Sequence, residues 1–555
     1  MSSRRKLVTS ALPYVNNLPH LGNIVGSLLS ADVFSRYSRL RGDEVLFVCG
    51  TDEYGTASEV TADKEGISPA DLCTKNSKKH KEVYDWFDIK FEVFGRTSCS
   101  AHKEMTQKIF MEIWNNGHFT SKIEMRFFCP KCEMFLADRY VSGTCRLCQS
   151  NNARGDQCDG CGTILSIEDV LDPKCSSCSS SPSKKETEHL FFNLESFQDR
   201  ISECIEKYSA GWTPAARQIA LEWKGKELIP RCITRDLKYK WGVPVPVSGY
   251  EGKVLYVWFD APIGYITFTS DAGKLSWWSD ENTELYEFMG KDNVFFHSVF
   301  FPAMLMGTSS IFKYPKVISS THYLMYEKGK FSKSQNRGIF GHNLLEDRIG
   351  PAGVWRFHLM RIRPETDDSD FSWTEFHESL NSILINTVGN LCHRVISYIN
   401  KSLGGRMARV SLPQSVKEAL DSALLDYNRH MEATNIRQGV SKIVEIANIG
   451  NGYVQQAFSE KVEKEEMGRR MSSAANILLL LSRVLSPVTP SEAYKLQEIL
   501  NSIEKNTIPD RFTEELQEGH VINPSVLLFK PLTDEQIEEV QKLCTKECPF
   551  EIKKQ

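Results

Sequence analysis

Eight of the 16 cysteines in this 555-residue chain form four Cys-x-x-Cys pairs within one short segment. The pairs are Cys129/Cys132, Cys145/Cys148, Cys158/Cys161 and Cys175/Cys178. One pair presents two thiolates to a metal ion, and two pairs supply the four ligands of a closed tetrahedral zinc site. Four repeats of this spacing have no packing reason, which disfavours free buried thiols. We expect two Zn²⁺ ions with a structural role, because a site saturated with cysteine keeps no open position for water.

Composition excludes some classes of protein and leaves others open. No apolar stretch is long enough to span a membrane, and residues 7–12 have the pattern of a short strand and not of a signal-peptide core. Clustered cysteines without an export signal indicate a reducing compartment, so we expect a cytoplasmic protein with no membrane partner. The net charge of −4 means that any RNA must bind to local basic surfaces.

The N-terminal residues have the pattern of a βαβ unit, which is the start of a parallel sheet. Residues 6–12 and 45–49 are strand-like, and the helix between them carries apolar residues at helical spacing. Strand-like runs return at residues 254–259, 294–296 and 317–319. The sheet that the N-terminus begins is therefore expected to be completed far along the chain.

Residues 117–230 lose this periodicity and contain the cysteine pairs, so we interpret them as an insertion into the sheet domain. From about Phe371 helical stripes continue to the end of the chain, which predicts a helical bundle. We therefore expect an α/β fold: a Rossmann-type parallel-sheet catalytic domain with a zinc-binding insertion and a C-terminal α-helical bundle. The expected boundaries are 1–116 and 231–320 for the two halves of the sheet domain, 117–230 for the insertion, 321–370 for a region that contains a short basic loop, and 371–555 for the bundle.

The turn between the first strand and the first helix contains His20, Gly22 and Asn23. Ligands of a parallel sheet bind beyond the carboxyl ends of its strands, where a helix N-terminus offers free N–H groups to phosphate. Gly22 permits close approach of a nucleotide to the backbone, and His20 and Asn23 can donate hydrogen bonds to phosphate oxygens. The alternative interpretation is a solvated turn with a helix-capping asparagine.

A second motif is the short basic loop at residues 328–336, which contains Lys330, Ser332 and Lys333. Two lysines on one loop can close over a triphosphate and neutralise the charge that develops as pyrophosphate leaves. The alternative is an ordinary solvated surface loop.

Taken together, the sequences His-Leu-Gly-Asn at residues 20–23 and Lys-Phe-Ser-Lys-Ser at 330–334 resemble the HIGH and KMSKS motifs of class I aminoacyl-tRNA synthetases. Asn23 and Phe331 depart from these motifs, and neither departure removes a phosphate donor. Segments 10–14, 51–55, 258–265 and 290–297 are similar to the methionyl-tRNA synthetase family, in family order, and the resemblance covers nearly the whole chain.

The resemblance implies an activity and a set of site residues. The activity is activation of L-methionine with Mg²⁺-bound ATP to methionyl-adenylate, followed by transfer to the 3′-terminal adenosine of tRNA(Met). His20, Asn23, Lys330 and Lys333 are the implied catalytic residues. Residues implied to bind ATP are His20, Gly22, Asn23, Gly290, Asp292, Leu324, Lys330, Ser332 and Lys333. Residues implied to bind methionine are Ala11, Leu12, Tyr14, Asp52, Trp258, Ala261, Pro262, Tyr265 and His297, among which Asp52 holds the ammonium group.

The same resemblance implies how the cysteines pair and where the anticodon binds. Cys145/Cys148 and Cys158/Cys161 resemble the single zinc site of family members with two pairs, which leaves the outer pairs for a second ion. Residues 390–394 resemble the anticodon-reading helix, with Asn390 and Arg394 as its polar pair. The family's stacking tryptophan is absent, since no Trp follows Trp373, and we expect Phe458 or Tyr453 to stack instead.

Other classes of protein remain open at this level. A small nucleotidylyltransferase also uses a His-x-Gly-His loop, but it needs neither the helical third nor the cysteines. A zinc-ribbon nucleic-acid binder leaves the Lys330 loop and segment 258–265 unexplained. Sister synthetases for leucine, isoleucine, valine or cysteine share both phosphate motifs.

Overall fold

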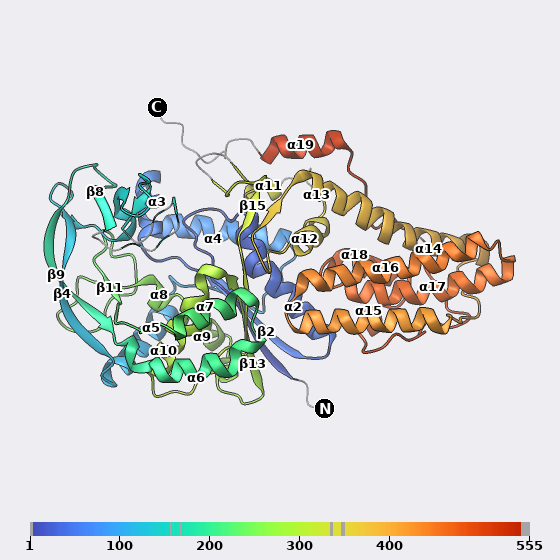
Figure 1. Cartoon of the computed structure of the whole chain (residues 1–555), viewed down its shortest axis with the longest axis horizontal. Helices are drawn as coiled ribbons and strands as arrows, with labels where there is room; N and C mark the ends of the chain where they lie inside the picture. Colours follow the sequence, from blue (N-terminus) through green and yellow to red (C-terminus); the bar gives the residue numbers. More distant parts are fainter. Residues whose placement is uncertain are drawn as a thin grey trace.

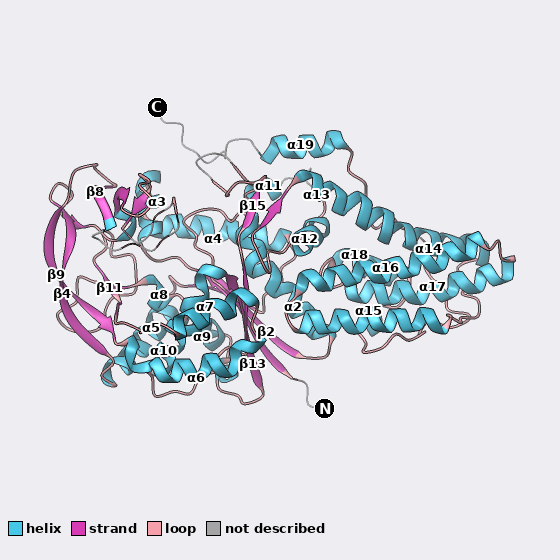
Figure 2. Cartoon of the chain, in the orientation of Figure 1, coloured by secondary structure: helices cyan, strands magenta, loops and turns pink. Residues whose placement is uncertain are grey.

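The computed structural model describes residues 4–155, 158, 160–161, 163, 165, 169–332, 337–345, 350–524 and 526–544. The molecule is elongated, with the cysteine-rich insertion at one end, a parallel sheet in the middle and a helical bundle at the other end (Figure 1). Coloured by secondary structure, strands are gathered in the insertion and the middle, and the far end is helical (Figure 2). The predicted α/β architecture is confirmed.

The central sheet has five parallel strands in the order β14-β13-β1-β2-β3. Their bounds are β1 Arg5–Ser10, β2 Glu44–Thr51, β3 Val93–Arg96, β13 Thr283–Gly290 and β14 Val317–Thr321. Alternate strand residues point to opposite faces. Val8 and Phe47 pack with α2 (Leu29–Leu40) and the bundle, whereas Leu7 and Leu46 pack with α9 (Ile263–Asp271).

Two of the predicted strands are wrong. Residues 254–259 form the two-residue strand β12 (Val254–Leu255) and then the helix α8 (Val257–Asp260), and residues 294–296 are helical. Short apolar runs do not distinguish a buried strand from a buried helix. The true strand β13 was missed because Glu284 and Glu287 interrupt its apolar pattern, although Glu287 is only 1% exposed.

The first helical run begins at the carboxyl end of β1 and passes through α1 (Leu21–Asn23), a π-helical turn (Ile24–Leu28) and α2. Such π-turns occur frequently at functional sites. At the start of the run, Oδ1 of Asn23 accepts the backbone N–H of His20 at 3.1 Å. This contact starts the helix just beyond the sheet.

The insertion is built on a long antiparallel ribbon of β4 (Phe119–Cys129) and β9 (Ser183–Phe192). At its far end is a small sheet of β6 (Val141–Cys145), β7 (Ala153–Arg154) and β8 (Val170–Cys175). Cys129, Cys145 and Cys175 are the last residues of β4, β6 and β8. The ribbon therefore carries the cysteines away from the central sheet.

The C-terminal part is a helical bundle, as the apolar stripes predict. Its helices are α14 (Asn390–Leu403), α15 (Gln414–Glu432), α16 (Ile436–Ser459), α17 (Lys464–Leu485) and α18 (Pro490–Ile499). The stripe residues Leu384, Leu391 and Val395 are fully buried. Within the described part of the chain, no helix has the length and apolar character that a membrane crossing requires.

A buried arginine joins the bundle to the sheet domain. Arg356 on α12 (Ala352–Arg361) is 0% exposed and donates to Asp32 of α2 at 2.7 Å and to the carbonyls of Pro487 and Val488. The guanidinium groups of Arg356 and Arg36 outweigh burial and keep the pKa of Asp32 below its usual value. The ion pair of Arg356 and Asp32 therefore remains charged. It is held by residues of both the sheet domain and the bundle.

Candidate active site and cysteine clusters

A cavity of about 540 Å³ opens at the carboxyl ends of the parallel strands. Fifteen of the site residues predicted from the sequence line it: Ala11, Leu12, Tyr14, His20, Gly22, Asn23, Asp52, Trp258, Ala261, Pro262, Tyr265, Gly290, Asp292, His297 and Leu324. Segments distant in sequence are therefore brought to one space large enough for a small ligand.

His20 and Asn23 form one side of the cavity. The imidazole of His20 is stacked on the ring of Phe331, with centroids 4.5 Å apart and planes 8° apart. Burial lowers the pKa of His20 to about 4, so the ring is neutral at neutral pH and acts as a hydrogen-bond donor without charge. Because Oδ1 of Asn23 already accepts the N–H of His20, the amide NH₂ is the part of this side chain that can donate a further hydrogen bond.

Gly22 lies between these two residues in the sequence, and its lack of a side chain leaves room for the imidazole of His20. A Cβ atom at this position lies 3.0 Å from Cε1 of His20 and 3.1 Å from its Nδ1. A side chain at this position therefore requires the imidazole to shift by a few tenths of an ångström. The helix-capping role that was the alternative interpretation of Asn23 is present in the structure. Asn23 also lines the cavity, so the two roles do not exclude each other.

The basic loop meets the same cavity through Phe331, which lines it. Lys330 is exposed, and neither Lys330 nor Ser332 belongs to the lining that the described residues form. Lys333 lies outside the described residues. The contact between Phe331 and His20 shows that the two predicted phosphate motifs converge.

Asp52 is a buried carboxylate with an unsatisfied oxygen. It follows β2, is 2% exposed, and its Oδ1 has no hydrogen-bond partner among the described residues. Burial, followed by the nearby charges of Asp260 and Glu53, raises its pKa well above the usual range. A buried carboxylate on a cavity wall with a free acceptor is suited to a cationic group of a ligand.

Aromatic rings enclose the other side of the cavity. Trp258 is stacked on Phe296 with centroids 3.8 Å apart and planes 5° apart, and Tyr14 meets the Trp258 ring edge-on at 6.2 Å. Tyr265 and His297 are buried behind them and hydrogen-bonded to each other. An apolar or thioether side chain is favoured in such surroundings.

At the rim, Asp292 is engaged by a residue that the sequence did not single out. The hydroxyl of Tyr323 lies 2.8 and 2.7 Å from the two carboxylate oxygens of Asp292 and donates to them. The ammonium of Lys291 lies 4.2 Å from the centroid of the Tyr323 ring and 3.3 Å from Asp368. Asp292 is thus already oriented toward a hydrogen-bond donor.

Sequence reasoning missed several lining residues, including His80, Tyr323, Phe331 and Phe340. His80 lies on α4 (Pro69–Trp86), where its Nε2 is 2.7 Å from the carbonyl oxygen of Asn17. Phe331 belongs to the basic motif at residues 330–334, and no local pattern marks the other three positions. The available signal was the proline- and asparagine-rich turn at residues 13–19. Such a turn needs neighbouring residues to hold its backbone, and His80 is one of them.

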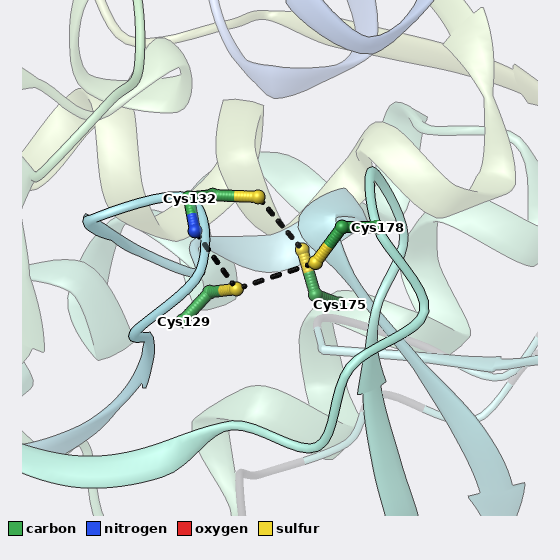
Figure 3. Close-up of side chains that lie close together, drawn as sticks. All are labelled: Cys129, Cys132, Cys175 and Cys178. Atoms are coloured by element: carbon green, nitrogen blue, oxygen red, sulfur yellow. Dashed lines mark hydrogen bonds between the residues drawn. The ribbon is translucent and has the colours of Figure 1, made fainter.

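The eight cysteines form two groups of four. Cys129, Cys132, Cys175 and Cys178 face one another (Figure 3), and Cys145, Cys148, Cys158 and Cys161 form the second group. Within each group all sulfur atoms lie within 4.8 Å of one another. The sulfur atoms of Cys129 and Cys178 are 3.5 Å apart, and those of Cys148 and Cys158 are 3.6 Å apart. Tetrahedral zinc at about 2.3 Å from each sulfur requires sulfur separations of about 3.8 Å, so both groups can hold an ion. The inner pairs are grouped together and so are the outer pairs, as expected.

The predicted anticodon pair lies on α14. Asn390 is exposed, and Arg394 donates to Oε1 of Gln455 at 3.1 Å while its guanidinium lies 4.8 Å from the ring centroid of Phe458. Phe458 is 41% exposed, whereas Tyr453 is 5% exposed and packed in the bundle core. Of the two aromatic residues expected to stack on bases, only Phe458 has an accessible ring.

Comparison with known proteins agrees with this arrangement. A family model described as tRNA synthetases class I (M) matches residues 6–396, and the model for the anticodon binding domain of methionyl tRNA ligase matches residues 405–546. The fold and the cavity are thus those of a class I tRNA synthetase.

Individual relatives agree with both models. The probable cytoplasmic methionine–tRNA ligase of Encephalitozoon cuniculi is 42% identical over 97% of this chain and 98% of its own length. The cytoplasmic enzyme of Saccharomyces cerevisiae is 41% identical over 97% of this chain and 73% of its own. The fold is shared with Mycobacterium tuberculosis methionyl-tRNA synthetase in complex with methionyl-adenylate, at a TM-score of 0.76 and 22% identity over 95% of this chain and 99% of the other. The chain belongs to the methionyl-tRNA synthetase family, and the nucleotidylyltransferase and zinc-ribbon alternatives are set aside.

Proposed function

We propose that this protein activates L-methionine with ATP and transfers it to the 3′-terminal adenosine of tRNA(Met) in the cytoplasm. Family membership supports the proposed reaction, and Asp52 is the observation that supports this cavity as the methionine-binding site. Its unpaired, buried carboxylate oxygen on the wall of a largely apolar cavity matches a substrate that joins an ammonium group to an apolar side chain.

Methionine binds between Asp52 and the aromatic wall. Asp52 accepts the α-ammonium, and Trp258, Tyr265 and His297 enclose the thioether, for which sulfur–aromatic contact contributes ~0.3–1.5 kcal/mol. Leu12 and Tyr14 close the pocket toward solvent. The remaining proposed contacts are Ala11, Ala261 and Pro262.

ATP binds along the side formed by the first helical run. Gly22 and Gly290 permit close approach, Leu324 and Ser332 flank the nucleotide, and Asp292 accepts from the ribose hydroxyls. Asn23 and neutral His20 donate to phosphate oxygens, and Lys330 and Lys333 reach the triphosphate from the basic loop. A Cβ on Gly290 meets no atom within 4 Å, which supports open space there for a ligand.

The chemistry needs no protein nucleophile. The methionine carboxylate attacks the α-phosphorus of Mg²⁺-bound ATP in line, the new O–P bond replaces the bond to the leaving oxygen, and pyrophosphate departs. Positioning and donation to the charged phosphate supply the catalysis, as in other phosphoryl-type transfers. The 2′-hydroxyl of the terminal adenosine then attacks the activated carbonyl and releases AMP.

The other parts of the chain support tRNA binding and structure. We infer that each cysteine group holds one Zn²⁺, which stabilises the insertion (117–230) without taking part in the chemistry. Residues 321–370 contact the tRNA stem, and the bundle (371–555) reads the anticodon through Asn390 and Arg394. The cation–ring contact between Arg394 and the exposed Phe458 supports Phe458 as the stacking platform.

Exchange of labelled pyrophosphate into ATP tests the activation step. The purified protein is assayed with methionine and separately with leucine, isoleucine, valine and cysteine. We expect exchange with methionine that exceeds exchange with each other amino acid. Charging is then measured with tRNA carrying the CAU anticodon and with the same tRNA carrying a changed anticodon. Exchange that does not depend on methionine contradicts the proposal.

A further inference from the structure

A series of ring contacts leads outward from the aromatic wall of the cavity. Phe296 is stacked on Trp258, and its ring centroid lies 5.2 Å from that of Phe295. The ring centroid of Phe295 in turn lies 4.3 Å from that of Trp223. Trp223 lies near the end of α7 (Pro214–Lys224), outside the cavity lining, and both Trp223 and Phe295 are half-buried. The aromatic surface therefore extends beyond the amino-acid pocket toward the insertion.

A cation covers the outer rings. The guanidinium of Arg231, on β10 (Arg231–Cys232), lies 5.6 Å from the centroid of Trp223 and 5.2 Å from that of Phe295. The ammonium of Lys226 lies 4.8 Å from the Trp223 ring. Cations over aromatic faces are favourable, and arginine planes also stack on nucleic-acid bases.

Within the part of the chain that the structure describes, no anion lies against Arg231 to match its charge. Its Nε is buried without a hydrogen-bond partner, and among the described residues no carboxylate forms an ion pair with Arg231 or Lys226. Burial lowers the pKa of Arg231, which means that the surroundings disfavour the charge. Leaving a buried donor unpaired costs stability, so the arrangement points to an anionic ligand that completes it.

The nucleotide that enters the cavity is not that ligand. His20 and Phe331 stack on each other in the cavity wall, whereas Trp223 and Arg231 contact Phe295 and lie outside the lining that the described residues form. The substrate that must still reach the cavity is the end of the RNA. Its terminal ribose must meet the adenylate, so the preceding unpaired nucleotides lie on the surface around the opening.

We propose that Trp223, Phe295, Arg231 and Lys226 form a subsite for the single-stranded 3′ end of the tRNA. A base stacks against the aromatic and guanidinium planes, and a backbone phosphate pairs with Arg231 and Lys226. Single-stranded RNA is generally held by this combination of rings and cations. The inference rests on the proposed function, since it assigns a binding surface for the second substrate of that reaction.

The test measures amino-acid activation and tRNA charging separately in the variant Arg231→Met. This substitution removes the charge and keeps the length of the side chain. We expect methionine-dependent pyrophosphate exchange within twofold of wild type, and kcat/KM for tRNA charging about tenfold lower, the loss typical of one stacking or charge contact. Lys226→Met is expected to act in the same direction. Lys224→Ala is the matched control, because its ammonium is already paired with Glu206 at the same helix end. Thermal unfolding checks that each variant is folded.

Binding to shortened RNA makes the assignment specific. Affinity is measured for intact tRNA and for tRNA that lacks its last three nucleotides. We expect Arg231→Met to weaken binding of the intact RNA and to leave binding of the shortened RNA unchanged. Equal weakening of both RNAs, normal charging by the variant, or an equal fall in exchange and charging overturns the subsite. Wild-type protein without methionine-dependent exchange instead overturns the proposed function, so the two failures are distinguishable.

Discussion

The hydroxyl of Tyr265 lies 3.0 Å from Nε2 of His297 on the wall of the cavity. Nδ1 of the same histidine lies 2.9 Å from the carbonyl oxygen of Asn293, which can only accept, so Nδ1 carries the hydrogen. Burial lowers the pKa of His297 to about 4, and the ring is neutral at physiological pH. Nε2 is therefore an acceptor, and Tyr265 donates to it. The pair therefore presents a fixed, uncharged surface to the cavity.

Replacement of Tyr265 by phenylalanine tests this wall. The substitution leaves Nε2 of His297 buried without a donor, which costs about 1–3 kcal/mol, and frees the imidazole to reorient. We expect kcat/KM for methionine in pyrophosphate exchange to fall about tenfold, mostly through KM. Tyr250→Phe removes a hydroxyl that bonds to Ser121 in the insertion and is the control. An unchanged KM for methionine in Tyr265→Phe contradicts the role.

The variant Asp52→Asn separates an effect on methionine binding from an effect on the stability of the fold. Loss of the charge that we propose holds the ammonium is expected to lower kcat/KM for methionine by about 100-fold. Since the carboxylate is buried with an unpaired oxygen, the neutral amide is expected to raise the melting temperature and not to lower it. Exchange kinetics and thermal unfolding are measured on the same preparations, with the exposed Asp199→Asn as control. A variant that loses activity and also melts earlier indicates a structural role for Asp52.

The pKa of Asp52 also predicts a pH dependence. Because burial and the neighbouring Asp260 raise this pKa, the carboxylate binds a proton more tightly in the folded protein than in the unfolded chain. The associated stability is present at low pH and is lost as pH rises through the raised folded pKa. Binding has the opposite dependence, since only the ionised form holds an ammonium. We expect kcat/KM for methionine to fall as pH decreases through that pKa, and Asp52→Asn to lack this acidic limb.

The two cysteine groups predict the metal content. Purified protein is expected to contain two zinc ions per chain by elemental analysis, and Cys129→Ser and Cys145→Ser are each expected to contain one, because they remove a ligand from different groups. Cys204→Ser, outside both groups, keeps two. Fewer than two ions in the wild-type protein would falsify the count.

Phe458 predicts a defect confined to charging. Phe458→Ala removes an exposed ring next to Arg394, and loss of one base–aromatic stack corresponds to about a tenfold or greater fall in kcat/KM for tRNA. Pyrophosphate exchange is expected to be unchanged, since Phe458 does not line the cavity. Tyr494→Ala, which removes another exposed ring of the bundle, is the control. If charging by Phe458→Ala is normal, the anticodon is read without this residue.

Local patterns were sufficient for part of the fold. Stripes such as Leu384, Leu391 and Val395 repeat with the helical period, and the Cys-x-x-Cys spacing depends only on the geometry of one turn. The strand β13 and the helix after Leu255 were not predictable in this way. Their class depends on which neighbours bury them, and Glu287 in the middle of β13 has no local sign of being buried.

The sequence by itself determined the fold class, the helical bundle, the cysteine pairs and about half of the residues on the cavity wall. Each of these follows from spacing along one segment or from motifs that resemble a family. Only the tertiary structure decided that Tyr323 engages Asp292, and that Phe458 is accessible and Tyr453 is not. It also decided that Arg231 lies over Trp223 and Phe295 with no ion-pair partner among the described residues. These relationships join residues from separate elements. Their distances and burial arise from packing of the whole chain, which no local pattern encodes.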